Sequence, residues 1–586
     1  MRDDRSRRPL RIALVFPPAM PPTSPPLGIA ALKPYLETRS AVEVRNFDLN
    51  LAYFEQAFQW LSDGRLRMRI QKMDYETTAK KAAEARSFFC GQAGTQSFFD
   101  LASYSEHAGV YSGFGSVLNG LFDNFARKIL LGLPVPSLVT RFFSELVGPL
   151  IAFRPELIGF SILFSQQIFF ALALAKLCKG SGQPQEPDGA LAESPCSFGA
   201  KIVFGGATFS VMPDPGRLLA GPVPVYQGGE PREVDTGRLI DYLIVGEGEA
   251  ALESVAGFLA SGSGPDASGP ISSQYRIPGL LHLVAGKLER NPPGVPLDLN
   301  TLPLPDFYDF PLDKYHSPHP VLPYLASRGC PWRRCAFCTH QKTYLAYREE
   351  DAANTSERLS ALQEQYGVRH FCLVDEMVHP RRMDRIAADL IGKSAQLYFS
   401  AYARPSGFSS RLLEKAHRAG LRLVMWGLES ASQRLLDLMC KGTIAQKIPA
   451  ILNSASEAGI WNLLFVIFGF PTETKAEWRN TLDFLGSIHD SVHALSRSRY
   501  VLLEGSQVFC NPQRYGIKRI IDRPQRDPVS IAYDYEVTEG LTQEEVAVMF
   551  QESLARLSGL GRSQWFGQFR EHMLLFASRE RNDKRT

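Results

Sequence analysis

Three cysteines lie within nine residues in the middle of the chain, directly after an apolar run. They are Cys330, Cys335 and Cys338, and the run covers 321–326. A strand that leads into a short loop would place three thiolates around one inorganic centre, and thiolates are ligands of iron–sulfur clusters and zinc. The next cysteine is Cys372, so a [4Fe–4S] cluster held here would keep one iron open. The alternative is a zinc knuckle or a structural cysteine cluster.

The size and composition of the chain restrict its class. At 586 residues it is too long for one hydrophobic core, so three or four domains are expected. The hydrophobic content of 45% and charged content of 21% are typical of a globular protein, and a net charge of +3 gives no global sign of nucleic-acid binding. Only nine cysteines are present, which indicates no disulfide framework. Reduced thiols and an iron–sulfur centre favour a cytoplasmic protein.

Neither a membrane helix nor a signal peptide is predicted. The longest apolar stretch, 157–177, contains Ser161, Ser165 and two glutamines in its first half. A membrane helix needs about 20 mostly apolar residues. The charged start of the chain, 1–8, is followed by an apolar run that prolines interrupt.

The first half of the chain alternates between predicted strands and helices. Apolar runs rich in branched residues predict parallel strands at 11–16, 42–48, 157–162, 200–204 and 242–245. Helical patterns stand at 27–37, 167–179 and 249–259. This alternation predicts a doubly wound, Rossmann-like α/β domain, built from residues 1–50 and 148–290. Such folds bind ligands at the carboxyl ends of their strands.

Loops and glycines at those strand ends are the candidate ligand contacts of this front domain, since glycine permits close approach of a ligand. The candidates are Pro17, Pro18, Ser161, Ser165, Gly205, Gly206, Gly246 and Glu247. Between the second and third strands, residues 51–147 are rich in aromatic residues and helix formers and predict a helical insertion. It is either a cap over a pocket or a packed subdomain. The stretches 180–199 and 261–270 have the composition of surface loops.

A second alternation follows a proline-rich linker at 291–320. Strands are predicted at 321–326, 370–374, 398–402, 421–426, 462–468 and 497–503. Helices are predicted at 351–366, 382–391, 409–419, 432–439, 445–458 and 474–488. Six βα units predict a partial (β/α)6 barrel over 321–505, with its site at the strands' carboxyl ends. Residues 506–586 predict a small α-rich region, which lids the barrel or only packs against it.

Polar and glycine residues follow each proposed strand of this barrel. They are Asp375, Glu376, Arg404, Glu429, Ser430 and Gly469. Taken one at a time, each acidic residue is explained by a solvated loop end or a helix N-cap. The segment 441–443 follows a predicted helix, and the simple interpretation is that Gly442 caps that helix. The order of these groups behind one cysteine loop is what points to a shared site.

The cysteine loop and the strand ends together resemble the radical S-adenosylmethionine (SAM) superfamily, over about 302–503. The resemblance implies that Cys330, Cys335 and Cys338 hold a [4Fe–4S] cluster whose open iron chelates SAM. One departure concerns the loop itself. Four residues, 331–334, separate the first two cysteines where the family usually has three, so the loop must bulge. Trp332, Arg333 and Arg334 either cover the cluster or stand exposed.

The resemblance also assigns expected roles to the strand-end residues. It implies that Phe337 lies near the adenine of SAM, Asp375 and Glu376 near its amino group, Arg404 near its carboxylate, and Glu429 and Ser430 near its ribose. Gly469 opens a turn similar to the family's Gly-x-Pro-Gly-Glu segment. In this chain Thr472 replaces the second glycine of that segment. The segment 441–443 also resembles a segment of the family, which is the alternative to the helix cap.

The front domain resembles the B12-binding-like domain that precedes the barrel in one radical SAM subgroup. The resemblance implies that cobalamin binds at the eight strand-end residues named above. No Asp-x-His-x-x-Gly segment is present, so cobalamin would bind without a protein histidine ligand. The alternative is that the domain has kept its fold and lost the cofactor.

The function implied by these resemblances is that of a cytoplasmic radical SAM enzyme. Reductive cleavage of SAM at the cluster would give a 5′-deoxyadenosyl radical, with electrons from a flavodoxin- or ferredoxin-type donor. The first expectation is cobalamin-dependent C-methyl transfer to a small metabolite or peptide. The alternatives are a radical cyclisation, rearrangement or oxidation, and, in another class, a non-catalytic iron–sulfur or cobalamin sensor. No nucleic-acid or membrane partner is expected.

Overall fold

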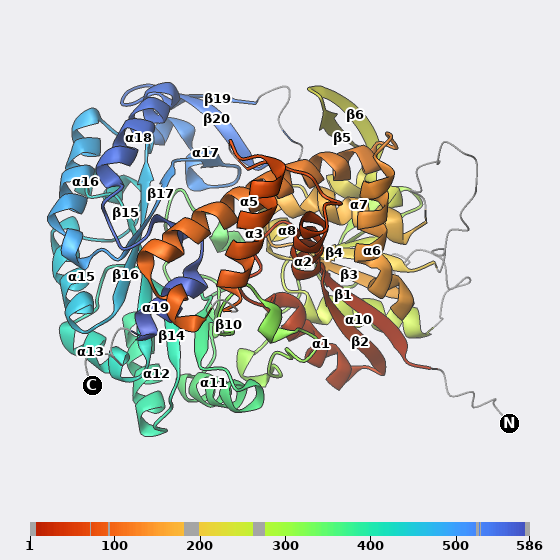
Figure 1. Cartoon of the computed structure of the whole chain (residues 1–586), viewed down its shortest axis with the longest axis horizontal. Helices are drawn as coiled ribbons and strands as arrows, with labels where there is room; N and C mark the ends of the chain where they lie inside the picture. The colour runs from red at the N-terminus through yellow and green to blue at the C-terminus, as the bar shows by residue number, and fades with distance from the viewer. Residues whose placement is uncertain are drawn as a thin grey trace.

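The computed structural model describes residues 8–579 except 71, 92–93, 181–198, 262–275, 523–526 and 528. Two parallel sheets dominate it, one in each half of the chain, with helices packed between and around them (Figure 1). The two predicted surface loops fall almost wholly outside the described residues. Among the helices that the structure describes, none combines the length and the apolar character needed to cross a bilayer.

The front domain contains a seven-stranded sheet in the order β2-β1-β3-β4-β7-β8-β9. Its five parallel strands are β1 (Leu10–Phe16), β2 (Val42–Asp48), β3 (Leu157–Ser161), β4 (Lys201–Gly205) and β7 (Tyr242–Ile244). Helices α1 (Leu27–Arg39) and α10 (Glu249–Ser261) cover one face, and α7 (Ile168–Cys178) covers the other. The predicted doubly wound fold is confirmed. Sequence reasoning missed the antiparallel edge strands β8 (Leu280–Val284) and β9 (Lys287–Arg290) and the hairpin of β5 (Pro222–Gln227) and β6 (Glu230–Asp235).

Helices fill the stretch between β2 and β3. They are α2 (Leu49–Ser62), α3 (Tyr75–Phe89), α4 (Thr95–Phe98), α5 (Leu101–Leu130) and α6 (Ser137–Phe153). Aromatic side chains form much of their core; the rings of Phe58 and Phe114, for example, stack at 4.4 Å. The same core continues into the barrel and the C-terminal helix, and α3 and α5 lie across the molecule between the two sheets (Figure 1). The insertion is therefore packed against both domains.

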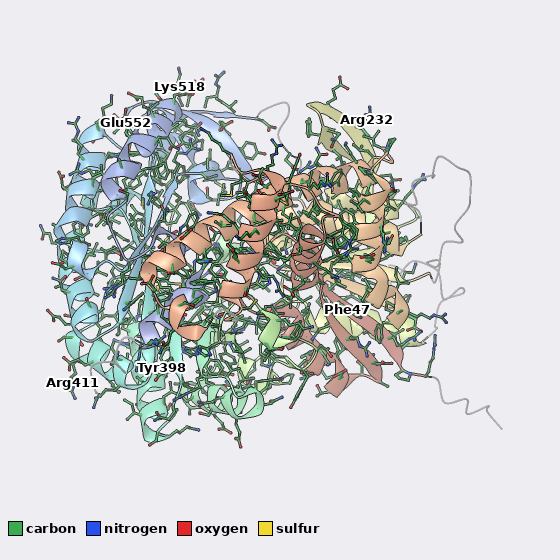
Figure 2. All side chains as sticks on the ribbon, in the orientation of Figure 1. Phe47, Arg232, Tyr398, Arg411, Lys518 and Glu552 are labelled. Carbon is green, nitrogen blue, oxygen red and sulfur yellow. The ribbon has the colours of Figure 1, made fainter. Side chains whose placement is uncertain are left out.

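The second half of the chain forms a six-stranded, all-parallel sheet. Its strands are β10 (Val321–Tyr324), β13 (His370–Leu373), β14 (Tyr398–Ala403), β15 (Leu421–Glu429), β16 (Trp461–Phe468) and β17 (Ala494–Arg499), neighbours in that order. Its outer face carries α11 (Ala352–Tyr366), α12 (Pro380–Gly392), α13 (Ser410–Arg418), α15 (Ile448–Glu457) and α16 (Lys475–Ser487), whereas α14 (Gln433–Leu438) packs in a separate cluster with Ala336. The predicted partial barrel is confirmed. Charged side chains such as Arg411 project from these helices (Figure 2).

The last described helix of the chain covers part of the inner face of the barrel. Helix α19 (Arg570–Arg579) packs on β13, β14 and β15, and its Met573–Ala577 segment is buried against the inner side chains of these strands. The C-terminal region also holds α17 (Gln507–Cys510), α18 (Gln543–Leu557) and a three-stranded sheet. That sheet consists of β18 (Leu502–Leu503), β19 (Ile517–Ile521) and β20 (Ala532–Val537). An α-rich description of this region was thus incomplete.

The turn after β16 buries a carboxylate. Gly469 (φ +77°) and Thr472 (φ +71°) both adopt left-handed backbone, which strains a β-branched residue such as Thr472. Arg434 holds the turn by donating to the Thr472 carbonyl at 2.8 Å and to its hydroxyl at 3.0 Å. One carboxylate oxygen of Glu473 accepts the N–H of Gly469 at 2.5 Å, and the other is buried without a partner. Burial raises the pKa of Glu473 to about 8.

The buried carboxyl of Glu473 predicts a pH-dependent stability. Its pKa rises from 4.5 in the unfolded chain to about 8 in the fold. The native state therefore keeps a proton that the unfolded state loses. This contribution is fully present below pH 4.5 and falls by about 1.4 kcal/mol per pH unit until pH passes the folded pKa. Glu473→Gln should remove this slope, because the amide does not titrate. Chemical denaturation of both proteins from pH 5 to 9 checks this; parallel curves would contradict it.

Candidate functional site

The cysteine loop is held at both ends by a two-stranded hairpin. Strand β11 (Ser327–Arg328) pairs antiparallel with β12 (Arg348–Glu349), so the chain leaves and returns at one place. Gly329 lies at the start of the loop with φ +80°, and a Cβ there would come within 3.2 Å of the Ala346 carbonyl oxygen. Only glycine meets both demands without strain. The backbone is therefore well fixed at Gly329, the residue directly before Cys330.

The middle of the loop is held by two further backbone contacts. The N–H of Ala336 donates to the Met439 carbonyl at 2.8 Å, and the N–H of Val508 donates to the Ala336 carbonyl at 3.1 Å. The loop is thereby fixed between the segment after α14 and helix α17. The C-terminal region thus helps to hold the cysteine loop.

The bulge required by the four-residue spacing lies at Arg333. This residue has φ +49°, in the left-handed region, and its guanidinium donates to the Leu345 carbonyl at 3.0 Å. Arg333 and Arg334 are exposed, whereas Trp332 turns inward. The indole N–H of Trp332 donates to the Cys440 carbonyl at 2.8 Å. Arg333 and Arg334 are therefore exposed, as one alternative expected, and a covering role for Trp332 stays a prediction.

The three cysteines are free thiols of intermediate exposure, and they lie near enough for their charges to act on one another. Burial raises the pKa of Cys335, and it raises the pKa of Cys338 to about 12. The charges of the neighbouring cysteines add to both shifts, while Lys441 and Arg404 oppose the shift at Cys335. In the part of the chain that the structure describes, no three His, Cys, Asp or Glu side chains stand close enough to ligate a single metal ion. What favours a cluster here is that one anchored loop carries three thiols and lies beside two cations, Lys441 and Arg404.

A buried ion pair lies beside the cysteine loop. Lys441 Nζ contacts Glu429 Oε1 at 2.7 Å, and Lys441 stands 5.8 Å from the centre of the Phe337 ring. Burial alone lowers the pKa of Lys441, but the charges of Glu429 and Cys335 outweigh burial and raise it. At Gly427 a Cβ would come within 2.6 Å of Lys441 Nζ. A side chain at position 427 would therefore collide with Lys441, which explains the glycine near the end of β15.

Gly442 has a different role from the predicted helix cap. The left-handed position after α14 belongs to Cys440 (φ +53°), not to Gly442. Gly442 also has positive φ, but a Cβ there would come within 2.2 Å of the Trp332 ring. The helix-cap interpretation was wrong, because this glycine makes room for the indole. The spacing of the segment 441–443 was the only sequence signal for either Lys441 or Gly442.

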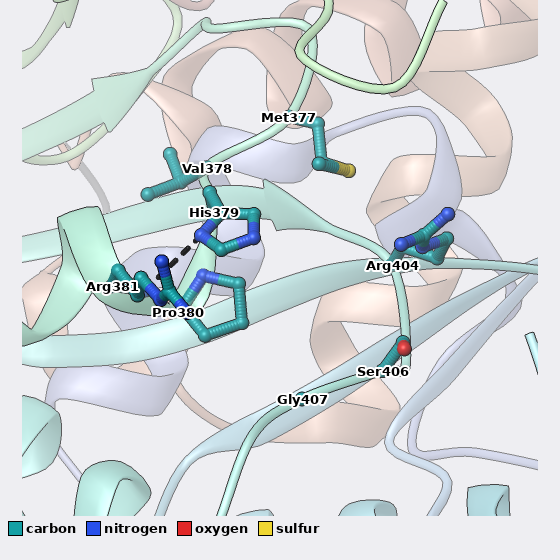
Figure 3. A pocket seen from close by; sticks show the side chains of 8 residues that line it. All are labelled: Met377, Val378, His379, Pro380, Arg381, Arg404, Ser406 and Gly407. Carbon is teal, nitrogen blue, oxygen red and sulfur yellow. Dashed lines mark hydrogen bonds between the residues drawn. The ribbon is translucent and has the colours of Figure 1, made fainter. Parts of the chain in front are cut away.

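Arg404 joins the cysteine loop to a cavity. Its guanidinium lies 3.8 Å from the Trp332 ring centre and donates to the Lys441 carbonyl at 2.9 Å, while its Nε is buried without a partner. The cavity has a volume of about 220 Å³ and lies between the loops after β13 and β14. Figure 3 shows Arg404 on one side of it and His379 with Arg381 on the other. This arrangement suits an anionic group such as a carboxylate.

Other predicted SAM contacts are turned into the fold. Asp375 is buried and accepts from the Ser327 hydroxyl and the Ala326 N–H. Ser430 is fully buried and accepts the N–H of Ser432 at 3.1 Å. A Cβ on Gly469 would come within 2.5 Å of Val546. In this structure these three residues are turned into the strand ends, and their contacts with SAM stay a prediction. Glu376 remains half-buried at the edge, paired with His340 at 3.2 Å.

The predicted ligand edge of the front domain is assembled by its own loops. Gln167 ties two of them together, donating to the Pro17 carbonyl at 2.7 Å and accepting from Leu163 and Phe164. A Cβ at Gly206 would come within 2.3 Å of the Ile162 carbonyl oxygen, so this glycine lets the β4 loop approach the β3 loop.

Apolar side chains and open backbone characterise this edge. Leu163 is 47% exposed and Phe164 is 41% exposed, and a Cβ at Gly246 would meet nothing within 4 Å. The remaining predicted contacts lie at the same strand ends or in the loops that follow them: Pro17, Pro18, Ser161, Ser165, Gly205 and Gly206. The front domain's one histidine is His282, on the antiparallel strand β8. An apolar edge without a histidine fits a large planar cofactor bound through its faces.

Glu247 departs from the prediction for this edge. Its carboxylate contacts Arg328 and Arg348, each at 2.6 Å, and these arginines belong to the hairpin of the cysteine loop. It therefore joins two domains, and it does not stand free for a cofactor. The neighbouring Glu249 also pairs with Arg328. Sequence reasoning did not identify either contact.

Comparisons with known proteins match the barrel segment to a known superfamily. Residues 324–485 match the Radical SAM superfamily. The chain is 28% identical over 253 residues to an uncharacterized methyltransferase of Pyrococcus horikoshii, which covers 42% of this chain and 52% of that protein. It is 25% identical over 252 residues to the anaerobic magnesium-protoporphyrin IX monomethyl ester cyclase of Rubrivivax gelatinosus, covering 41% and 44%. The chain thus matches about half the length of these curated relatives.

Solved structures resemble nearly the whole chain. The cobalamin-dependent SAM radical enzyme OxsB, with aqua-cobalamin and SAM bound, has a TM-score of 0.60 at 14% identity, over 93% of this chain and 67% of that one. The radical SAM methyltransferase TsrM from Kitasatospora setae, with cobalamin and a [4Fe–4S] cluster bound, has a TM-score of 0.56 at 14% identity, over 97% and 99%. The chain therefore contains a radical SAM domain joined to an N-terminal α/β domain, in the fold of cobalamin-dependent radical SAM enzymes.

Proposed function

We propose that this protein is a radical SAM enzyme whose cluster is bound by Cys330, Cys335 and Cys338. The observation that carries the proposal is the anchored loop of three free thiols at the carboxyl end of β10, in the segment that matches the superfamily. A [4Fe–4S] cluster on three protein thiolates keeps one iron available to the amino and carboxylate groups of SAM. When bound and reduced, such a cluster supplies the electron that cleaves SAM to methionine and a 5′-deoxyadenosyl radical.

The residues around the loop have complementary charges for SAM. Glu376 offers a carboxylate for the amino group, and Arg404 offers a guanidinium at a cavity for the carboxylate. The pair of Glu429 and Lys441 lies next to Phe337, where the resemblance expects ribose and adenine. These groups stand on neighbouring strand ends, so one extended ligand can reach them all. Their work is to bind and orient SAM and to exclude water from the reacting atoms.

The substrate chamber is proposed to lie on the inner face of the barrel, above α19. Inner side chains low in the sheet, such as Cys372 and Leu463, are buried, whereas Val374 and Phe465, nearer the strand ends, are accessible. Arg570 forms part of the floor and donates to the Tyr402 hydroxyl at 2.6 Å. A chamber of this kind suits a small metabolite or the side chain of a peptide.

The reaction that we propose first is cobalamin-dependent methyl transfer to carbon. It is supported by the apolar ligand edge of the front domain and by the likeness to TsrM, OxsB and a curated methyltransferase. The likeness to the magnesium-protoporphyrin ester cyclase favours a radical cyclisation or oxidation as the second candidate. A non-catalytic sensor is the least favoured, because sensing does not need paired charges around a SAM site. We propose a cytoplasmic location and a flavodoxin- or ferredoxin-type electron donor.

Anaerobic reconstitution tests the cluster. The protein should bind about four irons per chain, as one [4Fe–4S] cluster requires, and should form 5′-deoxyadenosine from SAM with dithionite. Cys335→Ala should lose both properties, because two thiolates do not hold the cluster in a reactive form. Cys510→Ala, at an exposed cysteine outside the loop, is the matched control and should retain both. A Cys335→Ala protein that still cleaves SAM would remove this cysteine from the cluster.

The front domain is tested by its own cofactor. Protein purified from cells grown with hydroxocobalamin should show the visible absorbance bands of a corrin. Leu163→Asp should abolish those bands, because it places a charge on the exposed apolar edge, while leaving iron content unchanged. If the wild-type protein shows no corrin bands, the domain has lost the cofactor and the cyclisation or oxidation becomes the preferred reaction.

A further inference from the structure

Two acidic residues of the front domain reach across to the hairpin that carries the cysteine loop. Glu247 and Glu249 follow strand β7, and both pair with Arg328. Arg328 is the second residue of β11 and lies two positions before Cys330. Glu247 also contacts Arg348, which pairs with Arg328 across the hairpin. These four charged residues link the two strands of the hairpin to one loop of the front domain. We call them the clamp: Glu247, Glu249, Arg328 and Arg348.

Two members of the clamp are buried, and the other two, Glu247 and Arg348, are partly buried. The side chain of Arg328 is 10% exposed and that of Glu249 is 7% exposed. Burial alone lowers the pKa of Arg328, but its two carboxylates outweigh burial and raise it. Burial raises the pKa of Glu249, and Arg328 more than reverses this. Removing one partner from a buried pair leaves an uncompensated charge, which is strongly unfavourable. The hairpin is therefore held where its arginines meet the two carboxylates.

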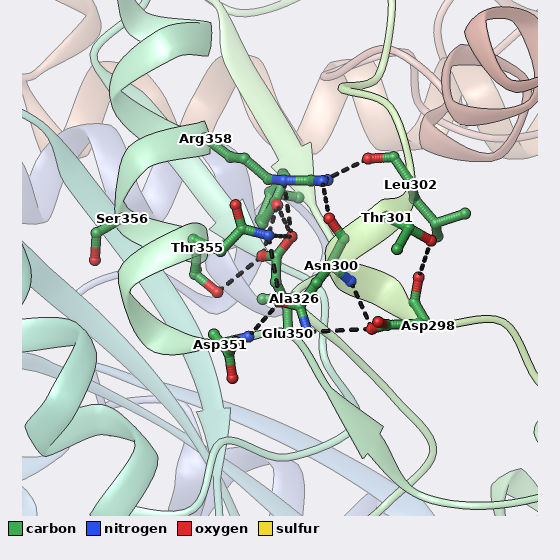
Figure 4. A network of polar contacts seen from close by, with 12 residues as sticks. Asp298, Asn300, Thr301, Leu302, Ala326, Glu350, Asp351, Thr355, Ser356 and Arg358 are labelled. Carbon is green, nitrogen blue, oxygen red and sulfur yellow. Dashed lines mark hydrogen bonds and ion pairs between the residues drawn. The ribbon is translucent and has the colours of Figure 1, made fainter. Parts of the chain in front are cut away.

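A second network holds the far end of the hairpin (Figure 4). Glu350, which follows β12, contacts Arg358 at 3.1 Å and accepts from Thr355 at 2.8 Å. Arg358 also donates to the carbonyls of Asn300 and Leu302, in the linker before the barrel. This network lies within the barrel and its linker. Among the ion pairs of the described residues, those of the clamp connect the hairpin to the loop after β7 of the front domain.

The clamp differs from the other contacts between front domain and barrel side. Lys33 pairs with Asp306 and Asp309, and Tyr315 donates to Asp48 at 2.6 Å, all in or beside the linker. Those contacts hold the domains together without the clamp. Loss of the clamp should therefore loosen the cysteine loop and leave the domains associated.

The same front-domain loop has a ligand-facing end. Gly246 precedes Glu247 directly, has φ +93° and faces open space at the ligand edge. We infer that Glu247 and Glu249 are positioning residues for Cys330, which fix the cysteine loop relative to the ligand edge of the front domain through Arg328. This inference rests on the proposed function, because the position of Cys330 matters to a cluster. The clamp would then hold two loops in place relative to each other, the cysteine loop and the loop after β7.

The test compares two isosteric variants at opposite ends of β7. The test protein carries Glu247→Gln and Glu249→Gln. The matched control is Asp241→Asn, because Asp241 immediately precedes β7 and also pairs with two cations, Lys179 at 2.8 Å and Lys201 at 3.3 Å. Two properties are measured: amide hydrogen exchange of residues 326–338 in the metal-free protein, and the rate at which an iron chelator removes iron from the anaerobically reconstituted protein.

The double variant should exchange faster at 326–338 than the wild-type and control proteins, with no change in the barrel strands. Its iron should be lost about 10- to 100-fold faster, if the loss of metal affinity that follows removal of a residue orienting a metal ligand is expressed in the dissociation rate. Arg328→Lys should be intermediate, since lysine keeps the charge but not the fork that meets two carboxylates.

The outcomes separate the inference from the proposed function. If wild-type protein binds no cluster, the proposed function fails, whatever the exchange data show. If wild-type protein binds a cluster and the double variant matches the wild type in both exchange and iron loss, the positioning role is overturned. Faster exchange across both domains in the double variant would also overturn it, because the acids would then act only as general contacts between domains.

Discussion

The loop that carries the three cysteines depends on contacts from three separate parts of the chain. The hairpin of β11 and β12 closes its two ends, and Met439 and Val508 fix its middle through the backbone of Ala336. A loop of this length pays a conformational entropy when it is ordered, and these contacts supply that ordering before any metal binds. The fold therefore fixes the backbone of the loop that carries the three thiols, and their side chains would still have to turn toward a cluster as it binds.

Each sheet has its proposed ligand site at one edge, because the parallel strands of a sheet end at a common edge. The front sheet places the loops after β1, β3, β4 and β7 at its edge, and the barrel places the cysteine loop and the residues after β13 to β16 at its own. The clamp between Glu247 and Arg328 links these edges. A reaction that uses one group from each domain needs this relative placement, since a small displacement of reacting atoms costs much of the rate.

The parallel strands of both sheets could be predicted from sequence because buried parallel strands are continuous apolar runs, whereas the antiparallel edge strands β8 and β9 were missed. The position of the candidate residues after successive barrel strands could also be predicted, since the sites of such folds lie at the carboxyl ends of their strands. Contacts between distant residues could not be predicted. Glu247 and Arg328 are 81 positions apart and carry no periodic signal. Asp375 and Ser430 were expected to face a ligand, but at a strand end a polar side chain can equally turn inward to satisfy backbone groups. Helix α19 has charged residues at both ends, and its burial in the barrel became clear only from the structure.

The central claim is that three thiolates hold a cluster with one iron open to SAM. Electron paramagnetic resonance of the anaerobically reduced protein, recorded with and without SAM, tests it most directly. The account predicts the signal of a reduced [4Fe–4S] cluster whose g-values shift when SAM is added, because SAM binds the open iron. A reduced cluster whose signal is unchanged by saturating SAM, or reconstituted protein without any such signal, would contradict it.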